Sequence, residues 1–553
     1  MKKMLFVALA ALGFVACNND LDEGNNVHSG EVENSYIAIN LNAADNSTRA
    51  EGEGSDYQEG DAAERKVNSA YFFFFNADGS AFPVTATSGP ATAPATGGVN
   101  WVSAVLTNKG EEMPNVSDVK NAVLVLSTYV GNYPSQMVAV LNWAPTAGEA
   151  YSLEQLHAAT GIQNTDGSFV MSNAVYSDGT KAVVSTPITA SDIFKDEENA
   201  KANPVTIYVE RIAAKVTVTA NNTVTDNRFK VTKPVTIGGS NKEVYVQVKG
   251  WSLHNDFNQS YLLKHVDLTK WTDTNLGFTW NDAPWHRCYW AESLPFSEIA
   301  ENTFPTTFSL AMGNNTNVLA GTYAENTYTY VGENTNYTLT DASECTKIIL
   351  KAELQEKKDD DTYQPLALAR WYSTYYAGEA DLRTAVASTI KFQYYWWDEA
   401  NNKRVTIGPD DLQIVEVEGT NTVKFQLSTS AQEESWFTKS GETYTAKTPT
   451  EMNELLGGIE KAVYYKSGET LYSVDIAHLG YKLEGDQLGD YGVVRNHIYN
   501  VVINSFGGFG SPVYIPTGNL DYPDDPTTTG DYVSAEVRVL SWRLVSQEVN
   551  VQP

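Results

Sequence analysis

The stretch Val205-Thr-Ile-Tyr-Val-Glu-Arg-Ile-Ala-Ala-Lys-Val-Thr-Val218 is rich in β-branched residues. Such a composition, with polar residues set between apolar ones, predicts β-strand rather than helix. Similar short runs recur along the chain, and Gly, Asn, Asp and Pro separate them. Further strands are predicted at residues 36–41, 67–75, 122–126, 137–141, 244–253, 347–354, 391–397 and 498–503. The sequence therefore predicts an antiparallel all-β protein.

Helices contribute little to the predicted fold. Two short ones are expected, at residues 152–159 and 449–461, and each has Ser or Thr near its start to cap free backbone N–H groups. A length of 553 residues suits two to four domains. We expect a domain break near residue 222, between the strand that ends at Val218 and the strand that begins at Val244.

The N-terminus has the pattern of an export signal. Lys2 and Lys3 precede an apolar run that is too short to span a bilayer as a permanent helix. The run ends in Phe14-Val-Ala-Cys17, which resembles a lipobox with Phe14 where Leu is more usual. Lipidation of Cys17 would add the two anchoring groups that stable membrane attachment needs. The alternative is an ordinary signal peptide with an incidental cysteine.

Charge and cysteine content exclude several classes of protein. The formal net charge is -30, which argues against binding to nucleic acid phosphates. After Cys17, the other cysteines are Cys288 and Cys345, too few for a disulfide-built scaffold. These two could pair in an oxidising compartment, or remain as thiols. No second apolar run is long enough to cross a membrane.

The sequence contains no recognisable catalytic or metal-binding motif. The seven histidines are scattered, and no HExxH, Cys-x-x-Cys, Gly-x-Ser-x-Gly or P-loop pattern occurs. We therefore predict no catalytic residue, no metal and no cofactor, and an enzyme is the weakest interpretation. The aromatic residues fall mostly inside strand-like runs, where core packing is the better explanation than a sugar-stacking platform.

The first predicted strand stands next to a candidate cleavage site. Tyr36, Ile37, Ile39 and Leu41 belong to a short strand whose apolar residues share one face. An open acidic segment, residues 45–64, follows it and contains the bond between Arg49 and Ala50. An arginine-specific protease that cuts this bond would leave the strand held only by non-covalent contacts. Departure of the strand would expose a groove of unpaired backbone.

The other end of the chain contains a candidate donor strand. A Pro- and Asp-containing linker, residues 516–531, precedes alternating apolar residues and a second apolar run. The predicted donor residues are Val533, Ala535, Val537, Val539, Trp542, Leu544 and Val545. Insertion of this strand into the groove of another subunit would be a head-to-tail contact, which propagates as a filament. Alternatively, the last strand closes its own sandwich and Arg49 is incidental.

Several of these motifs resemble the fimbrillin family of the Bacteroidales. They are the ends discussed above and Met137-Val-Ala-Val-Leu-Asn142, Val209-Glu-Arg-Ile-Ala-Ala-Lys-Val216, Val248-Lys-Gly-Trp251, Arg495-Asn-His-Ile-Tyr-Asn500 and Val539-Leu-Ser-Trp542. Within that family the sequence is most similar to the major subunit of the short fimbriae, which are type V pili. The linker before the last strand is shorter than we would expect of such relatives.

The resemblance implies two transthyretin-like β-sandwich domains, lipoprotein export, arginine-specific trimming and donor-strand polymerisation. The expected partners are identical subunits, anchor and tip accessory subunits, the protease, and the outer membrane before trimming. The expected location is a cell-surface fimbrium that mediates adhesion, aggregation or biofilm formation. Alternatives are a glycan-binding surface lipoprotein, or a tip or anchor subunit. The implied segments are a signal peptide (1–17), a propeptide with a temporary strand (18–49), two sandwiches (50–222 and 223–515), and linker plus donor (516–553).

Overall fold

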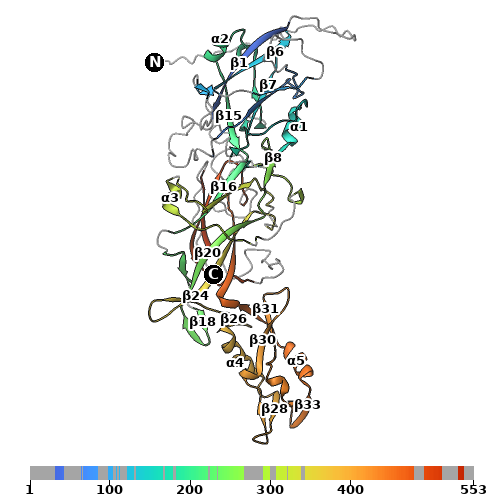
Figure 1. Cartoon of the computed structure of the whole chain (residues 1–553), viewed down its shortest axis with the longest axis vertical. Helices are drawn as coiled ribbons and strands as arrows, with labels where there is room; N and C mark the ends of the chain where they lie inside the picture. The colour runs from blue at the N-terminus through green and yellow to red at the C-terminus, as the bar shows by residue number, and fades with distance from the viewer. Residues whose placement is uncertain are drawn as a thin grey trace, which may run out of the picture.

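The computed structural model has an elongated shape, in which the chain passes from one end to the other and then returns, so that its C-terminal strands lie in the middle (Figure 1). It describes residues 32–42, 64, 66–84, 98–103, 107–108, 111–112, 121–129, 133–162, 164–165, 168–177, 182–221, 225–232, 235–266, 291–298, 305, 307–320, 322–337, 343–478, 491–513 and 533–540. In these ranges the chain is mostly β-strand with five short α-helices, so the all-β prediction is confirmed. None of the described helices has the length and apolar character to cross a membrane.

A ten-stranded sheet forms the N-terminal part of the molecule. Its main path is β3-β2-β7-β11-β15-β1-β6-β4-β5, and β14 pairs with β7. The strands are β1 (Val32–Asn42), β2 (Ala70–Phe75), β3 (Trp101–Ser103), β4 (Thr107–Asn108), β5 (Glu111–Glu112), β6 (Asn121–Tyr129), β7 (Gln136–Leu141), β11 (Met171–Asn173), β14 (Thr186–Pro187) and β15 (Val205–Arg211). Helix α1 (Leu153–Ala158) and helix α2 (Glu197–Ala202) lie beside this sheet (Figure 1).

Alternation along β2 explains how this sheet is buried on both faces. Phe72 and Phe74 belong to one core cluster, and Phe73 and Phe75 belong to another. Successive side chains of a strand point to opposite faces, so four consecutive phenylalanines fill two cores. The second cluster also contains Leu262, from a segment that follows β21 (Gln259–Tyr261). Strand β21 pairs with β8 (Thr160–Ile162), so a segment from later in the chain covers the N-terminal sheet.

The middle of the molecule contains two further sheets around a core of thirty buried residues. One sheet has the order β22-β16-β36-β38, with β23 beside β16, and the other has the order β17-β20-β24-β35-β37, with β25 beside β24. Their strands are β16 (Ala213–Ala220), β17 (Arg228–Lys230), β20 (Val244–His254), β22 (Gly313–Asn314), β23 (Tyr328–Gly332), β24 (Lys347–Lys357), β25 (Tyr363–Pro365), β35 (Glu469–Asp475), β36 (Ile498–Phe506), β37 (Ser511–Pro512) and β38 (Val533–Leu540). Helix α3 (Asn315–Leu319) contacts β36.

A third core lies at the end of the molecule opposite β1, within residues 369–462, which we call the end lobe (Figure 1). It combines part of a seven-stranded sheet, β19-β18-β27-β26-β34-β31-β30, with a four-stranded sheet, β29-β28-β32-β33. The elements are β18 (Val235–Ile237), β19 (Ser240–Lys242), β26 (Leu368–Trp371), β27 (Thr374–Ala377), α4 (Gly378–Ile390), β28 (Tyr394–Asp398), β29 (Lys403–Thr406), β30 (Leu412–Glu416), β31 (Thr422–Leu427), β32 (Trp436–Ser440), β33 (Thr443–Lys447), α5 (Pro449–Gly457) and β34 (Ala462–Tyr465). Within the predicted domain 223–515, the end lobe therefore has a hydrophobic core that is separate from the core of the middle sheets.

The strand and helix predictions differ from the structure mainly at their ends. The stretch 205–218 forms two strands, because the chain leaves one sheet after Arg211 and enters another at Ala213. Some pairings are parallel, including β1 with β15 and β16 with β36. Helix α5 begins at the predicted residue, with a capping box between Thr448 and Glu451, but ends at Gly457. The sequence did not predict α4, whose N-cap residue Ala377 makes no side-chain capping bond.

Gly250 occupies an irregular point of β20 where no larger residue fits. The register with β24 shifts between Val248 and Gly250, and a Cβ atom on Gly250 would lie 2.3 Å from the carbonyl oxygen of Phe308. We expect Gly250→Ala to lower the free energy of unfolding by about 1–3 kcal/mol, because backbone must move to relieve the overlap. Urea denaturation measures this change.

Gly457 in α5 is the matched control, because a Cβ atom there would meet nothing within 4 Å. Gly457→Ala should raise stability by up to about 1 kcal/mol, since alanine is the better helix former. Equal stability losses in the two variants would show that the packing around Gly250 is not the cause.

Candidate functional site

Strand β1 is an internal strand of the N-terminal sheet, between β6 and β15 (Figure 1). It runs antiparallel to β6 from Val32 to Asn40 and parallel to β15 from Ile39 to Asn42. The amide of Tyr36 also donates to the carbonyl of Phe194 (2.7 Å), and the amide of Phe194 donates to the carbonyl of Tyr36 (3.0 Å). The strand predicted to be temporary is therefore hydrogen-bonded along both of its edges.

The side chains of β1 complete the core of the N-terminal sheet. Ile37 and Ile39 are fully buried in the same cluster as Ile207 of β15, and Tyr36 is half-buried. The backbone of Leu41 lies in register with Ile207. Each buried isoleucine contributes roughly 1.5–3 kcal/mol by leaving water. Removal of β1 would thus uncover apolar core and the facing edges of β6 and β15.

Glu64, the first described residue after β1, is bound at the junction between the N-terminal and middle parts of the molecule. Its carboxylate accepts hydrogen bonds from the Lys215 ammonium (2.7 Å) and the Tyr330 hydroxyl (2.7 Å). Its carbonyl accepts one from Nε of Arg211 (2.6 Å). The side chains of Glu64 and Lys215 are 1% and 0% exposed, so both charges are removed from water. Each charge therefore depends on the other for its stabilisation.

Strand β38, which contains Val533, Ala535, Val537 and Val539, pairs antiparallel with β36 of its own chain. The pairing runs from Val533 opposite Phe506 to Leu540 opposite Ile498, with an irregularity near Ser505. It stands last in the order β22-β16-β36-β38, so it has a single strand neighbour among the described residues. Among the described residues the predicted donor strand is therefore an edge strand of its own sheet, and its donation to another subunit stays a prediction.

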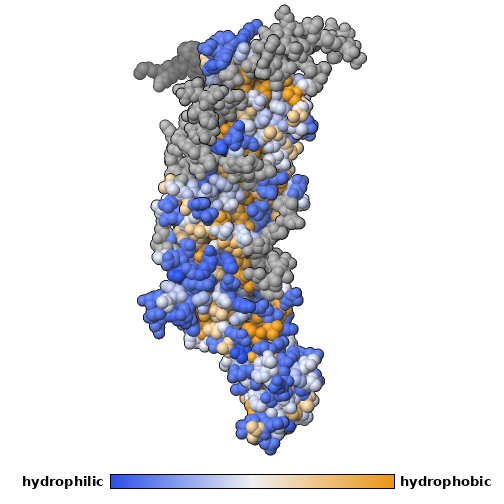
Figure 2. Space-filling model, in the orientation of Figure 1, coloured by the Kyte–Doolittle hydropathy of each residue, from blue (hydrophilic) through white to orange (hydrophobic). Residues whose placement is uncertain are grey.

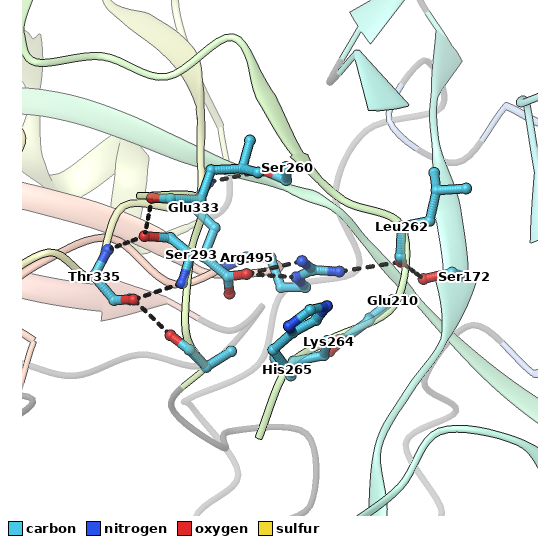
Figure 3. A network of polar contacts seen from close by, with 12 residues as sticks. Ser172, Glu210, Ser260, Leu262, Lys264, His265, Ser293, Glu333, Thr335 and Arg495 are labelled. Carbon is cyan, nitrogen blue, oxygen red and sulfur yellow. Dashed lines mark hydrogen bonds and ion pairs between the residues drawn. The ribbon is translucent and has the colours of Figure 1, made fainter. Parts of the chain in front are cut away.

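Arg495, from the motif before β36, is fully buried at the same junction (Figure 3). Its Nη2 and Nε atoms donate to Oε2 of Glu333 (2.8 and 3.1 Å), and its backbone amide donates to Oε1 (3.2 Å). Nη1 donates to the carbonyl of Leu262 (3.2 Å), which also accepts a bond from the Ser172 hydroxyl of β11. The guanidinium therefore ties the middle part to the segment that covers the N-terminal sheet.

A second buried ion pair, between Lys264 and Glu210 of β15, lies in the same network (3.2 Å; Figure 3). Burial raises the pKa of the Glu210 carboxyl, and the Lys264 charge opposes this shift. The rings of His157 and His265 stack with 3.8 Å between their centroids. Burial, together with the neighbouring His265, lowers the pKa of His157 to about 4, so its ring is neutral at neutral pH. Both ion pairs of the network are buried, which suits a structural joint.

Several predicted site residues lie outside the described residues. They are Cys17, Arg49, Ala50, Cys288, Trp542, Leu544 and Val545. Cys345 is described and fully buried, and its carbonyl accepts a hydrogen bond from the Asn255 side chain (2.9 Å). Pairing of Cys288 with Cys345 stays a prediction. In the described part of the chain, no group of three or more His, Cys, Asp and Glu residues is placed to hold a metal ion.

The sequence did not indicate the roles of Glu64 and Glu333. Each is a single acidic residue in a chain with 68 of them, and acidic residues are usually exposed. Their burial is decided by partners 151 and 162 residues away, Lys215 and Arg495. The motifs at 209–216 and 495–500 were sequence signals near these contacts, and neither indicated a partner.

Solved structures that align with nearly the whole chain have low sequence identity to it. A putative cell adhesion protein from Parabacteroides distasonis aligns at 11% identity and a TM-score of 0.36, over 94% of this chain and 98% of its own. A putative cell adhesion protein from Bacteroides eggerthii aligns at 12% identity and a TM-score of 0.33, over 95% and 100%. The C-terminally truncated tip fimbrial protein Mfa3 from Porphyromonas gingivalis aligns at 10% identity and a TM-score of 0.30, over 92% and 100%.

No curated protein matches the sequence. Residues 463–548 match the family model described as major fimbrial subunit protein type IV, fimbrillin, C-terminal. The matched range includes β36, which begins within the motif 495–500, and β38, which contains the predicted donor residues Val533, Ala535, Val537 and Val539. The predicted similarity to the fimbrillin family is thus confirmed, and it is carried by residues 463–548.

Proposed function

We propose that this chain is the shaft subunit, or major pilin, of a type V fimbria, which polymerises head to tail by exchange of β-strands. The single observation that carries the proposal is the position of β1, between β6 and β15 and covalently joined to the rest of the fold through the segment that contains Arg49. In this proposal the precursor is exported as an outer-membrane lipoprotein through Cys17. An arginine-specific protease then cuts between Arg49 and Ala50.

Cleavage would free β1 without loosening the body of the subunit. The first described residue after β1 is Glu64, which the buried contacts to Lys215, Tyr330 and Arg211 hold in place. The chain beyond the cut therefore keeps its anchor at the junction. What departs is a strand of eleven residues and its buried isoleucines.

The C-terminal strand is a suitable replacement for β1. Among the described residues β38 has one strand neighbour, β36, whereas a strand in the vacated position would lie between β6 and β15 and gain a second hydrogen-bonded edge. Its residues Val533, Ala535, Val537 and Val539 share one face, as Ile37 and Ile39 of β1 do. Valine burial at roughly 1.5–3 kcal/mol per side chain offsets the cost of association. The donor and groove lie on different surfaces, so the contact repeats along a filament.

Arg49→Ala tests the proposal in cells that produce the fimbria. We expect this variant to keep β1 and to form no filaments, while sheared wild-type filaments begin at Ala50. Arg49→Lys is the matched control, because it keeps the positive charge but removes the side chain that an arginine-specific protease requires. N-terminal sequencing and electron microscopy give the two measurements.

A chain that lacks residues 532–553 tests the donor end. It should fold, accept a strand after trimming, and shorten filaments when mixed with wild type, because it cannot donate to the next subunit. Normal filaments from the truncated chain alone would refute donation by this strand. Wild-type filaments whose subunits still begin at Cys17 would refute trimming.

A further inference from the structure

The four-stranded sheet of the end lobe carries a row of aromatic side chains on one face. Strand register places Trp397 of β28 opposite Arg404 of β29, and Tyr395 of β28 opposite Phe437 of β32. The neighbouring residues Tyr394, Trp396 and Trp436 point the other way and pack on the lobe core. The sheet therefore has one face on the core and one, with Trp397 and Phe437, that is partly exposed.

Arg404 lies over this outer face and is held there by three rings. Its guanidinium carbon is 4.3 Å from the ring centre of Tyr444, 5.0 Å from that of Phe437 and 5.5 Å from that of Trp397. The Lys439 ammonium lies 5.5 Å from the Tyr444 ring. Contact with ring faces fixes the plane of a guanidinium and leaves its N–H groups available for hydrogen bonds at the edge.

Two positive charges and no negative charge lie at the strand positions of this face. Arg404 and Lys439 are the charged residues that register places on it, and neither forms an ion pair within residues 343–478, all of which are described. In that range Lys347 and Lys466 pair with carboxylates, whereas Lys403 and Lys424, like the two cations of this face, form no ion pair there. In a chain of net charge -30, two cations that contact the same aromatic ring favour an anionic ligand.

We propose that this face, which comprises Trp397, Arg404, Phe437, Lys439 and Tyr444, binds glycans that carry carboxylate groups, such as those of uronic or sialic acids. The apolar C–H faces of sugar rings stack on the partly exposed aromatic rings, and the Arg404 guanidinium donates two hydrogen bonds to a carboxylate. Adjacent strands are about 4.8 Å apart, so aromatic residues on successive strands offer contacts to successive parts of an extended sugar chain. An acidic peptide would use the two cations but not the aromatic platform.

The position of the sheet suits a surface that meets external molecules. It lies in the end lobe, at the opposite end of the chain from β1, and the residues at that end are mainly hydrophilic in the face that Figure 2 shows. The proposed site is also independent of strand exchange, because β1 and β38 contribute nothing to it. It can be tested on the monomer.

Isothermal titration calorimetry of the full chain against a hyaluronan octasaccharide, its carboxyl-reduced form, 3′-sialyllactose and poly-glutamate tests the proposal. We expect the hyaluronan octasaccharide, 3′-sialyllactose or both to bind, and the one that binds identifies the acid. Carboxyl reduction and Arg404→Glu should each weaken binding by about tenfold or more, because each removes a charge-assisted contact. Poly-glutamate should bind at least about tenfold more weakly than the glycan.

Lys424→Glu is the matched control, because Lys424 is an exposed strand residue of the same lobe in the other sheet and the change alters net charge equally. It should leave binding unchanged. Phe437→Leu, with the fold checked by circular dichroism, should weaken glycan binding while the charge stays constant. The proposal is overturned if neither acidic glycan binds, if the reduced glycan or poly-glutamate binds equally well, or if Lys424→Glu weakens binding as much as Arg404→Glu.

Discussion

Replacing Arg495 by alanine is expected to lower the free energy of unfolding by about 3–5 kcal/mol, because Glu333 would remain as a buried charge without its partner. Both side chains are 0% exposed, and the guanidinium makes two contacts to the Glu333 carboxylate at 2.8 and 3.1 Å. The bond to the Leu262 carbonyl would be lost as well. Urea denaturation of the purified chain, followed by tryptophan fluorescence, measures the change.

The ion pair between Lys466 and Glu416 is the matched control. Its nitrogen–oxygen distance is also 2.8 Å, but its side chains are 70% and 52% exposed. Glu416→Ala should therefore cost about 1 kcal/mol or less, since water replaces the partner of each charge. Replacing Arg495 and Glu333 together by Met and Leu should restore much of the loss, because no buried charge remains. A loss for Arg495→Ala as small as the control's would show that the junction does not depend on this pair.

Glu64→Ala should lower the free energy of unfolding by about 3 kcal/mol, the lower end of the range for breaking a buried pair. Lys215 would be left buried, although the rings of Tyr323 and Tyr328, 3.5 and 4.1 Å from its ammonium nitrogen, would retain part of its stabilisation. The backbone bond from Arg211 to Glu64 would persist in part, since it does not use the Glu64 side chain. Urea denaturation again gives the magnitude.

Amide hydrogen exchange adds a local measurement of the same change. Loss of the Glu64 anchor should speed exchange at the start of the following chain, up to β2, more than in the end lobe, where Glu64 has no contact. Glu64→Gln keeps the shape and can still accept hydrogen bonds, so it should cost less than Glu64→Ala. Equal exchange in Glu64→Ala and the wild type across residues 66–75 would contradict an anchoring role.

Alternation of apolar residues made most of the strands predictable. The predicted strands 36–41, 137–141 and 244–253 lie within or coincide with β1, β7 and β20. In β20 buried residues alternate with less buried ones, whereas β7 is a short apolar run that is buried on both faces. Helix α4 was not predictable in the same way. It begins at Gly378, whose φ is +72°, without a capping side chain, and its buried residues Leu382, Val386 and Ile390 meet a core assembled from distant strands.

The two strands predicted to take part in assembly, β1 and the candidate donor strand β38, lie in different environments in the structure. The structure brings Tyr36, Ile37 and Ile39 into an internal strand, as their apolar alternation suggested. It pairs the candidate donor strand with β36 of the same chain, which no local pattern could decide, because an alternating strand fits any open edge of suitable register. The bond between Arg49 and Ala50 remains identified by sequence alone.

That this protein is built of β-strands, where several of them lie, and that its C-terminal part resembles the fimbrillins could all be inferred from local alternation and short motifs. The pairing of β1 along both edges, the burial of Glu64 and Arg495 in ion pairs, and the aromatic, cationic face of the end lobe became visible in the folded chain. Each of these depends on residues far apart in the chain, and burial and pairing at such distances are properties of packing rather than of local sequence.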